Sequence, residues 1–237
     1  MQFPDDFPIT KRWPAKHPDR LQLYSLTTPN GVKPSIMLEE IGLPYEAHYV
    51  DFGTKDQKTP EFLSLNPNGK IPAIIDPNGP GGKPLALFES GAILEYLAAK
   101  SGQLMPSDDT LAWQTRQWVY FQVGHIGPMF GQVGYFKKFE GKEISDPRVL
   151  QRYVDESKRL FGILDTRLAG RTWMMGDDYT IADIAIVGMV RNFINFYEAG
   201  DLVGYDSFTN VKAWFDRMLA RPAVQRGLTI PAKAAAN

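Results

Sequence analysis

The chain contains no cysteine among its 237 residues. This absence excludes disulfide bonds, zinc–thiolate sites and a cysteine nucleophile belonging to the protein. Any sulfur chemistry would therefore need a sulfur atom supplied by a ligand. Histidine is also scarce, because the chain has only 3, and His17, His48 and His125 lack the spacing of metal ligands. We expect no metal site.

A strong charge of either sign is also missing. The formal net charge of −1 gives no reason to expect binding to nucleic acid or to an anionic membrane. No apolar run approaches the roughly 20 residues that span a bilayer. Residues 1–20 carry scattered prolines and charges and lack the apolar core of a signal peptide. The sequence therefore predicts a cytoplasmic protein.

The hydrophobic content of 43% is ordinary for a globular protein, and the length allows one large domain or two modest ones. Residues 1–20 are predicted to form an irregular arm that Phe3, Phe7 and Trp13 could pin to a surface. Residues 21–102 show strand and helix patterns in the order β-α-β-α-β-β-α, the order of a thioredoxin-like domain. Residues 103–237 are predicted to be all-helical. The expected fold class is therefore a two-domain α+β/all-α protein.

The stretch from Leu21 to Ile41 organises the first domain. Its beginning, LQLYSL, predicts a buried strand, and apolar residues at helical spacing predict a helix over residues 32–41. The loop between them, TTPNG, is typical of a tight turn. Thr28 and Asn30 thus lie at a helix start, where unpaired backbone donors and the helix dipole favour an anion. Our hypothesis is that this anion is a thiolate that the protein does not itself provide.

Two patterns stand out in the second domain. Residues 180–183 (TIAD) resemble a capping box with Asp183 in place of glutamate, which indicates a structural helix cap and not a catalytic group. The glycine-rich residues 123–136 (VGHIGPMFGQVGYF) are compatible with a kinked helix or with a break between helices.

Three motifs in this order resemble the landmarks of the cytosolic glutathione transferase family: NPNGKIPA at 66–73, FESGAI at 88–93 and TIAD at 180–183. The resemblance covers nearly the whole chain. Within the family, TPNG at 28–31, Gln57 before PEF at 60–62, and Arg152 followed by Tyr153 resemble the nu-class bacterial enzymes. These enzymes are described as disulfide-bond oxidoreductases and are similar to the fungal prion-forming nitrogen regulator. The resemblance implies a homodimer that uses glutathione as co-substrate, one or two molecules per active site.

The resemblance also implies roles position by position. Thr28 and Asn30 would be the catalytic pair that faces the glutathione sulfur, and Ile71, just before a cis Pro72, would offer its backbone to the cysteinyl part of glutathione. The other binding residues implied are Gln57 near the glycyl end, Glu89 and Ser90 at the γ-glutamyl amine and carboxylate, Lys70 in an open role, and Arg152 reaching across the dimer interface toward a glutathione carboxylate.

Each of these residues also has an ordinary structural interpretation. Thr28 and Asn30 are residue types that form turns and helix caps, and Ser90 suits a helix cap. Pro72 suits a strand edge, and an arginine such as Arg152 on a long helix is usually a solvated charge.

The expected reaction is thiol–disulfide exchange, in which a glutathione thiolate attacks a small disulfide. Thr28 and Asn30 do not titrate, so they would stabilise the thiolate electrostatically and would not act as a general base. One alternative is a transferase or ether-cleaving lyase, in which the same thiolate attacks an electrophilic carbon. Another is a glutathione-binding regulator without catalytic activity.

Overall fold

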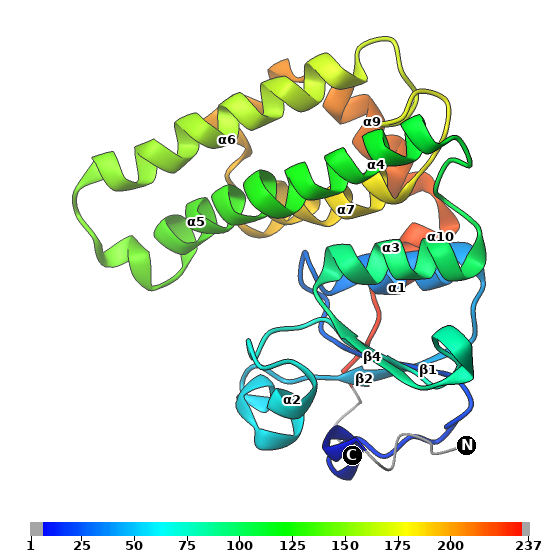
Figure 1. Ribbon diagram of the computed structural model, residues 1–237. Coiled ribbons are helices and arrows are strands. Elements are labelled where there is room, and N and C mark those ends of the chain that lie inside the picture. Colours follow the sequence, from blue (N-terminus) through cyan, green and yellow to red (C-terminus); the bar gives the residue numbers. More distant parts are fainter. Residues whose placement is uncertain (1–6, 234–237) are drawn as a thin grey trace. The chain divides into compact units, whose positions relative to one another are not determined.

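In the computed structural model, residues 7–233 are described, so Phe3 of the expected arm lies outside the described residues (Figure 1). Contacts divide the chain into two compact units. One unit contains the chain up to Ser101 together with the segment from Pro222, and the other runs from Gly102 to Arg221. None of the helices in the described part of the chain is long and apolar enough to cross a membrane.

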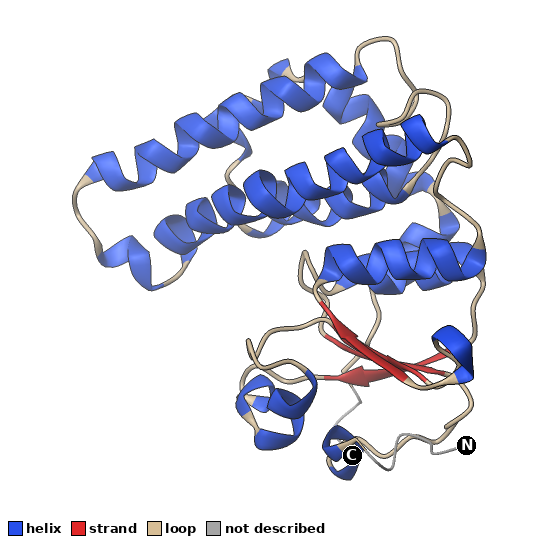
Figure 2. Ribbon diagram, in the orientation of Figure 1, coloured by secondary structure: helices blue, strands red, loops and turns tan. Residues whose placement is uncertain are grey.

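The first unit is built on a sheet of four strands with the order β2-β1-β3-β4. Strand β1 (Leu21–Ser25) pairs in parallel with β2 (Tyr45–Tyr49) and antiparallel with β3 (Ala73–Asp76), which pairs antiparallel with β4 (Leu85–Phe88). Helices α1 (Val32–Ile41) and α3 (Ser90–Ser101) pack together on one face, and the short α2 (Pro60–Leu65) lies on the other side (Figure 2). The predicted β-α-β-α-β-β-α order and the thioredoxin-like architecture are confirmed.

The organising stretch folds as its pattern predicts. All of β1 is buried, and Leu23 and Tyr24 are completely inaccessible at the centre of the sheet. Helix α1 turns Ile36 and Met37 into the core and ends at Gly42, whose φ of +67° is readily adopted only by glycine. The loop that carries the candidate site is therefore held between two buried elements.

The C-terminal segment departs from the predicted division of the chain, in which residues 103–237 form one domain. Helix α10 (Pro222–Gly227) packs on α1, and the hydroxyl of Ser35 donates a 2.7 Å hydrogen bond to the carbonyl of Gly227. A Cβ atom at Gly227 would lie 2.5 Å from Cα of Ile36, so glycine permits this close approach. Arg226 forms an ion pair with Glu39 on α1. The described residues after Arg221 thus belong to the first unit.

The arm is more ordered than its prolines suggest. Residues Pro8–Lys11 form a 3-10 helix, and Ile9 is completely buried. The predicted anchors Phe7 and Trp13 pack against the core cluster that contains Ile9, and the indole Nε1–H of Trp13 donates to the carbonyl of Tyr49 at 3.1 Å. The expectation of an irregular arm is therefore wrong for Pro8–Lys11, because a proline at the first position suits a short helix.

The second unit is helical. Its main elements are α4 (Asp109–Phe121), a π-helical turn (Gln122–Ile126), α5 (Gly127–Lys138), α6 (Pro147–Leu168), α7 (Ile181–Arg191), a second π-helical turn (Asn192–Phe196), α8 (Gly200–Val203) and α9 (Thr209–Ala220). A break in the glycine-rich stretch is therefore excluded, since a π-helical turn joins α4 directly to α5. Three aromatic rings that contact one another, from α5, α6 and the second π-helical turn, form part of its core: Phe130, Phe161 and Phe193.

The capping box at the start of α7 forms as predicted. The Asp183 carboxylate is buried and accepts hydrogen bonds from the backbone N–H groups of Thr180 and Met174 and from the indole of Trp214, at 3.0, 2.9 and 2.8 Å. Burial raises the pKa of Asp183 to about 6, and these donors favour the ionised form. Asp183 thus joins three segments of the helical unit and has a structural role.

Candidate functional site

The site is assembled at one edge of the sheet in the first unit. Strands β1 and β4 both pair antiparallel with β3, so they run in the same direction and end at the same edge. Helix α1 follows β1 and α3 follows β4, so the beginnings of both helices lie at that edge. Strand β3 starts there, because Ala73 pairs with Phe88 and with Tyr24. The topology therefore brings three loops together beside two helix N-termini, a favourable place for an anion.

The loop between β1 and α1 is closed by Thr28 and Gly31. The Thr28 hydroxyl oxygen accepts a hydrogen bond from the Gly31 N–H at 3.2 Å, and the Thr28 carbonyl accepts from Val32 N–H at 3.0 Å. A Cβ atom at Gly31 would lie 1.9 Å from the carbonyl oxygen of Leu26, so the loop needs glycine here. Thr28 thus closes the turn before α1, and its own hydroxyl hydrogen remains available for donation.

Asn30 is exposed, and a hydrogen bond from the buried Lys33 fixes the orientation of its side chain. Its side-chain oxygen Oδ1 accepts a 2.9 Å hydrogen bond from Nζ of Lys33. When Lys33 is protonated its amine only donates, so the oxygen of Asn30 then faces Lys33 and the NH2 group points away from it. Thr28 and Asn30 therefore both engage the protein through acceptor atoms and keep donors available, as the thiolate hypothesis requires.

Lys33 was not identified from the sequence. Its side chain is completely buried, and Nζ also donates to the hydroxyl of Ser90 at 3.1 Å. Burial lowers the pKa of Lys33 to about 7, while the carboxylate of Glu89 acts in the opposite direction. The available sequence signal was a lysine in the first turn of the predicted helix, three residues after Asn30.

Glu89 and Ser90 lie at the junction of β4 and α3. Glu89 is exposed and has a φ of +71°, a left-handed backbone conformation that is costly for a residue with a side chain. Such strain is concentrated at functional sites in proteins. Ser90 is buried as the first residue of α3 and does not precede the helix, so its predicted role as the cap is wrong. Its hydroxyl is instead fixed by Lys33.

Ile71 and Pro72 complete the edge. The Ile71–Pro72 peptide bond is cis, and both residues are buried just before β3. The Ile71 side chain reaches the first loop, since its Cδ1 atom would lie 3.0 Å from a Cβ atom at Gly31. Lys70 has an exposed side chain, and its carbonyl accepts a 2.5 Å hydrogen bond from Nδ2 of Asn66, which shapes the turn.

The remaining two predicted site residues, Gln57 and Arg152, are less closely associated with the three loops. Gln57 lies in the 3-10 helix Asp56–Lys58, and its carbonyl oxygen would lie 2.9 Å from a Cβ atom at Gly69, which places it beside the turn before Lys70. Its side-chain oxygen Oε1 is buried and has no hydrogen-bond partner among the described residues. Arg152 is exposed on α6 and belongs to the second unit. The structure therefore brings together Thr28, Asn30, Ile71, Glu89 and Ser90.

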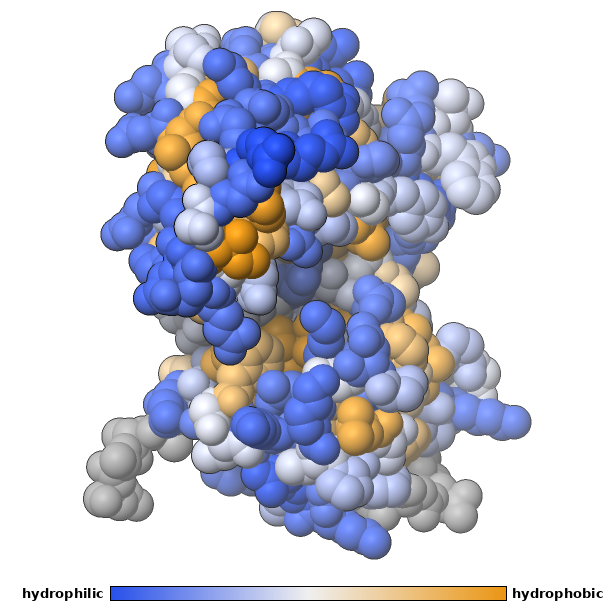
Figure 3. Space-filling view, turned by 90° about the vertical axis from the view of Figure 1, so that its left-hand side faces the viewer, coloured by the Kyte–Doolittle hydropathy of each residue, from blue (hydrophilic) through white to orange (hydrophobic). Residues whose placement is uncertain are grey.

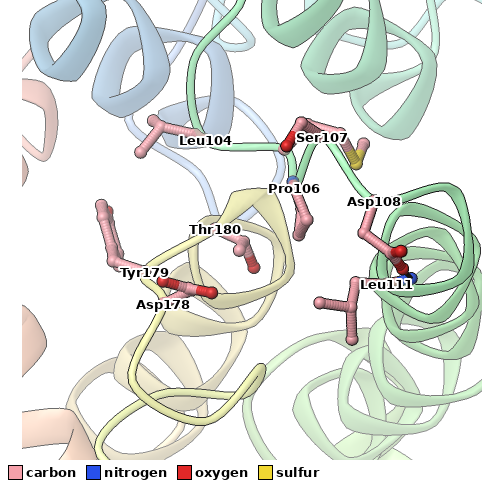
Figure 4. Close-up of a pocket in the computed structure, with 9 residues that line it drawn as sticks. Leu104, Pro106, Ser107, Asp108, Leu111, Asp178, Tyr179 and Thr180 are labelled. Atoms are coloured by element: carbon pink, nitrogen blue, oxygen red, sulfur yellow. Dashed lines mark hydrogen bonds between the residues drawn. The ribbon is translucent and has the colours of Figure 1, made fainter.

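A separate pocket of about 380 Å³ lies within the helical unit, between the loop before α4 and the loop before α7 (Figure 4). Two of its polar side chains, Asp108 and Thr180, cap the starts of helices. Asp108 accepts a 2.8 Å hydrogen bond from the N–H of Leu111, and Thr180 belongs to the capping box of α7. Within residues 7–233, no group of three or more histidine, aspartate or glutamate side chains could hold a metal ion.

Comparison with known proteins identifies the family. The model described as the glutathione S-transferase N-terminal domain matches residues 19–99, and that of the C-terminal domain matches residues 129–222. The chain is 42% identical over 209 residues to the disulfide-bond oxidoreductase YfcG of Escherichia coli (strain K12), a match that covers 88% of this chain and 94% of that protein. The chain belongs to the glutathione S-transferase family.

Solved structures of glutathione S-transferases extend the comparison. A glutathione transferase from Burkholderia graminis, with two glutathione molecules bound per subunit, is 65% identical to this chain and superposes with a TM-score of 0.96; the match covers 97% of this chain and 95% of that chain. A glutathione transferase from Pseudomonas putida, with one glutathione disulfide bound per subunit, is 64% identical with a TM-score of 0.94; the match covers 96% of this chain and 98% of that chain. The family and the disulfide-oxidoreductase subgroup predicted from the motifs are confirmed.

Proposed function

We propose that this glutathione S-transferase is a glutathione-dependent disulfide-bond oxidoreductase. The observation that carries the proposal is the pair of uncharged donors, the Thr28 hydroxyl and the Asn30 amide, at a helix start in a chain without cysteine. The side-chain oxygens of both residues accept hydrogen bonds within the protein, so their hydrogens are available to a ligand. The name of the relative YfcG, a disulfide-bond oxidoreductase, supports this reaction class.

The role of the donor pair follows from the acidity of thiols. A free thiol has a pKa of about 8.5, so only a few per cent is ionised at neutral pH. Hydrogen bonds to the charged form lower the pKa. Each pKa unit corresponds to about 1.4 kcal/mol of stabilisation of the thiolate relative to the thiol. Donors held in place before the ligand arrives stabilise the thiolate without reorganisation during the reaction. Thr28 and Asn30 would thus raise the thiolate fraction of bound glutathione.

The other residues would hold the tripeptide. Glu89 would accept the γ-glutamyl ammonium, and the Ser90 hydroxyl and the start of α3 would bind the γ-glutamyl carboxylate. The backbone of Ile71 would pair with the cysteinyl residue. Gln57 and Arg152 would contact the glycyl end and a carboxylate, the latter from a partner subunit, and Lys70 has no assigned contact.

The reaction balances without a protein thiol. The bound glutathione thiolate attacks one sulfur of the substrate disulfide, forming a mixed disulfide and releasing one thiolate, which takes a proton from water. A second glutathione thiolate attacks the glutathione sulfur of the mixed disulfide, so that glutathione disulfide forms and the second substrate thiol leaves. Relatives with two glutathione molecules or with glutathione disulfide bound have room for these species.

The test is an assay that couples reduction of bis(2-hydroxyethyl) disulfide by glutathione to oxidation of NADPH through glutathione reductase. We expect a rate well above the uncatalysed exchange, and a lower rate for Asn30→Ala. Absence of activity together with turnover of aryl halides would replace the proposal with conjugation or lyase chemistry. Calorimetric binding of glutathione without turnover of either substrate would indicate a regulator.

We also propose that two copies associate. Exposed side chains at helical spacing along one face of α4 and its π-helical extension are mostly apolar: Trp113 is 66% exposed, Tyr120 55% and Val123 39%, with Arg116 stacked on Trp113. On the face shown in Figure 3, hydrophobic residues lie in several separate patches among hydrophilic ones. Light scattering on the purified chain would contradict the proposal if it gave the mass of one chain.

A reducing compartment suits the proposed reaction, because cytosolic glutathione is kept mostly reduced and the reaction consumes the reduced form. We therefore propose a cytoplasmic location, which fractionation of cells producing the chain at native levels would test.

A further inference from the structure

The completely buried lysine beneath the candidate site joins its two halves. Nζ of Lys33 lies 2.9 Å from Oδ1 of Asn30 and 3.1 Å from the hydroxyl oxygen of Ser90, a residue 57 positions further along the chain. In the proposed site, Asn30 faces the sulfur of glutathione and Ser90 faces its γ-glutamyl end. Lys33 is therefore in direct contact with a residue at each end of that part of the ligand.

A lysine has a specific effect on both neighbours. Because an ammonium group donates three hydrogen bonds and accepts none, it is compatible only with the oxygen of Asn30 facing it and with a lone pair of Ser90 facing it. The amide hydrogens of Asn30 and the hydroxyl hydrogen of Ser90 are then both directed elsewhere. A neutral side chain of similar size, such as methionine, would leave both groups free to rotate.

The charge of the ammonium also bears on the site. In a region shielded from water, a positive charge interacts more strongly with nearby anions than it does in bulk solvent. Burial is the main cause of the lowered pKa of Lys33, and the neighbouring carboxylate of Glu89 opposes it. A bound thiolate or carboxylate would favour the ammonium form in the same way as Glu89.

We propose that Lys33 is a positioning residue for glutathione, one that fixes Asn30 and Ser90 as hydrogen-bond donors and supplies a buried positive charge behind the thiolate. This inference rests on the proposed function. Lys33 acts through Asn30 and Ser90 and by its field, and it does not contact the sulfur itself.

The test compares Lys33→Met with the wild type and with Lys83→Met, a control at an exposed lysine in the hairpin loop of the same unit. The readout is the thiolate absorbance of bound glutathione as a function of pH. We expect Lys33→Met to raise the pKa of the bound thiol by about one unit, which is a roughly tenfold smaller thiolate fraction at neutral pH. We also expect weaker glutathione binding by calorimetry and an unchanged control.

A folded Lys33→Met protein whose bound thiol titrates as in the wild type would overturn the inference. If glutathione does not bind the wild type at all, the proposed function fails first, so the two failures are distinguishable. If Lys33→Met does not fold, the inference is tested on the wild type alone. Binding of S-methylglutathione, which has no thiol, is measured by calorimetry near pH 7.5 in two buffers of different ionisation enthalpy. Net proton uptake by the protein on binding supports a buried cation at Lys33, and its absence contradicts the inference.

Discussion

At the scale of single residues, the proposed mechanism stabilises the thiolate of glutathione with two side chains that do not ionise, Thr28 and Asn30. Thr28 and Asn30 are ordinary turn and cap residues, and Thr28 does close the turn before α1. This role is compatible with the proposed one, since closing the turn uses the hydroxyl oxygen and leaves the hydroxyl hydrogen for a ligand.

The first prediction concerns Asn30. Replacing it with alanine removes one donor to the thiolate, and a hydrogen bond to a charged group is worth about 1.5–3 kcal/mol. We expect the rate of disulfide reduction at neutral pH to fall roughly tenfold to a hundredfold. We also expect a modest loss of thermal stability, because the buried ammonium of Lys33 loses one acceptor. Asn68→Ala, at another exposed turn asparagine, serves as the control. Equal loss in both variants would count against a role at the sulfur.

The second prediction concerns the pH dependence of stability. Burial lowers the pKa of Lys33 to about 7, so between about pH 7 and pH 10 the unfolded chain binds more protons here than the native protein does. Lys33 therefore makes the free energy of unfolding rise as pH increases through this window. We expect urea denaturation of Lys33→Met to show a smaller rise than the wild type. Parallel curves would show that the lysine titrates normally in the folded state.

At the scale of elements, close contacts between helices determine packing that the sequence pattern does not predict. Helix α10 reaches α1 because Gly227 has no Cβ. We expect Gly227→Val to destabilise the protein by about 1–3 kcal/mol, as forced overpacking does. Gly162→Ala on α6 is the matched control, since a Cβ there meets nothing within 4 Å and alanine favours a helix. Chemical denaturation of both variants measures the difference, and similar stabilities would contradict the tight contact.

The capping box of α7 gives the fourth prediction. Replacing Asp183 with alanine leaves three buried donors without an acceptor, on Met174, Thr180 and Trp214. Each such group costs about 1–3 kcal/mol, so we expect a loss of several kcal/mol in the free energy of unfolding. Asp178→Ala, at a nearby exposed carboxylate, should have little effect. If the two variants unfolded at the same temperature, the hydrogen bonds to Asp183 would not contribute to stability.

Element order was predictable because strands and helices in the first unit are separated by clear turn residues and keep simple periodicities. The family motifs then located Thr28, Asn30, Ile71, Glu89 and Ser90, which the topology gathers at one edge. Burial of a charged side chain runs against the usual preference of lysine, so Lys33 could not be found by pattern. The return of α10 to α1 was missed as well, because it depends on one glycine that meets a distant residue.

At the scale of the whole molecule, the lack of cysteine gives the fifth prediction. Preincubation with N-ethylmaleimide, followed by its removal before glutathione is added, should leave disulfide reduction intact, because the protein has no thiol to alkylate. An enzyme with a reactive cysteine, treated in parallel, should lose activity. Strong inactivation of this chain would point to a nucleophile among its own side chains and would contradict the proposed mechanism.

The packing of α10 on α1 has a consequence for biosynthesis. The unit that carries the candidate site is interrupted by residues 102–221, so its last helix leaves the ribosome only after the whole helical unit has been made. Domains usually fold in the order in which they emerge. During synthesis, the side of α1 that α10 later covers would therefore stay exposed, including the surface around Ile36 that Gly227 contacts in the folded protein. The helical unit could then fold before the first unit is complete.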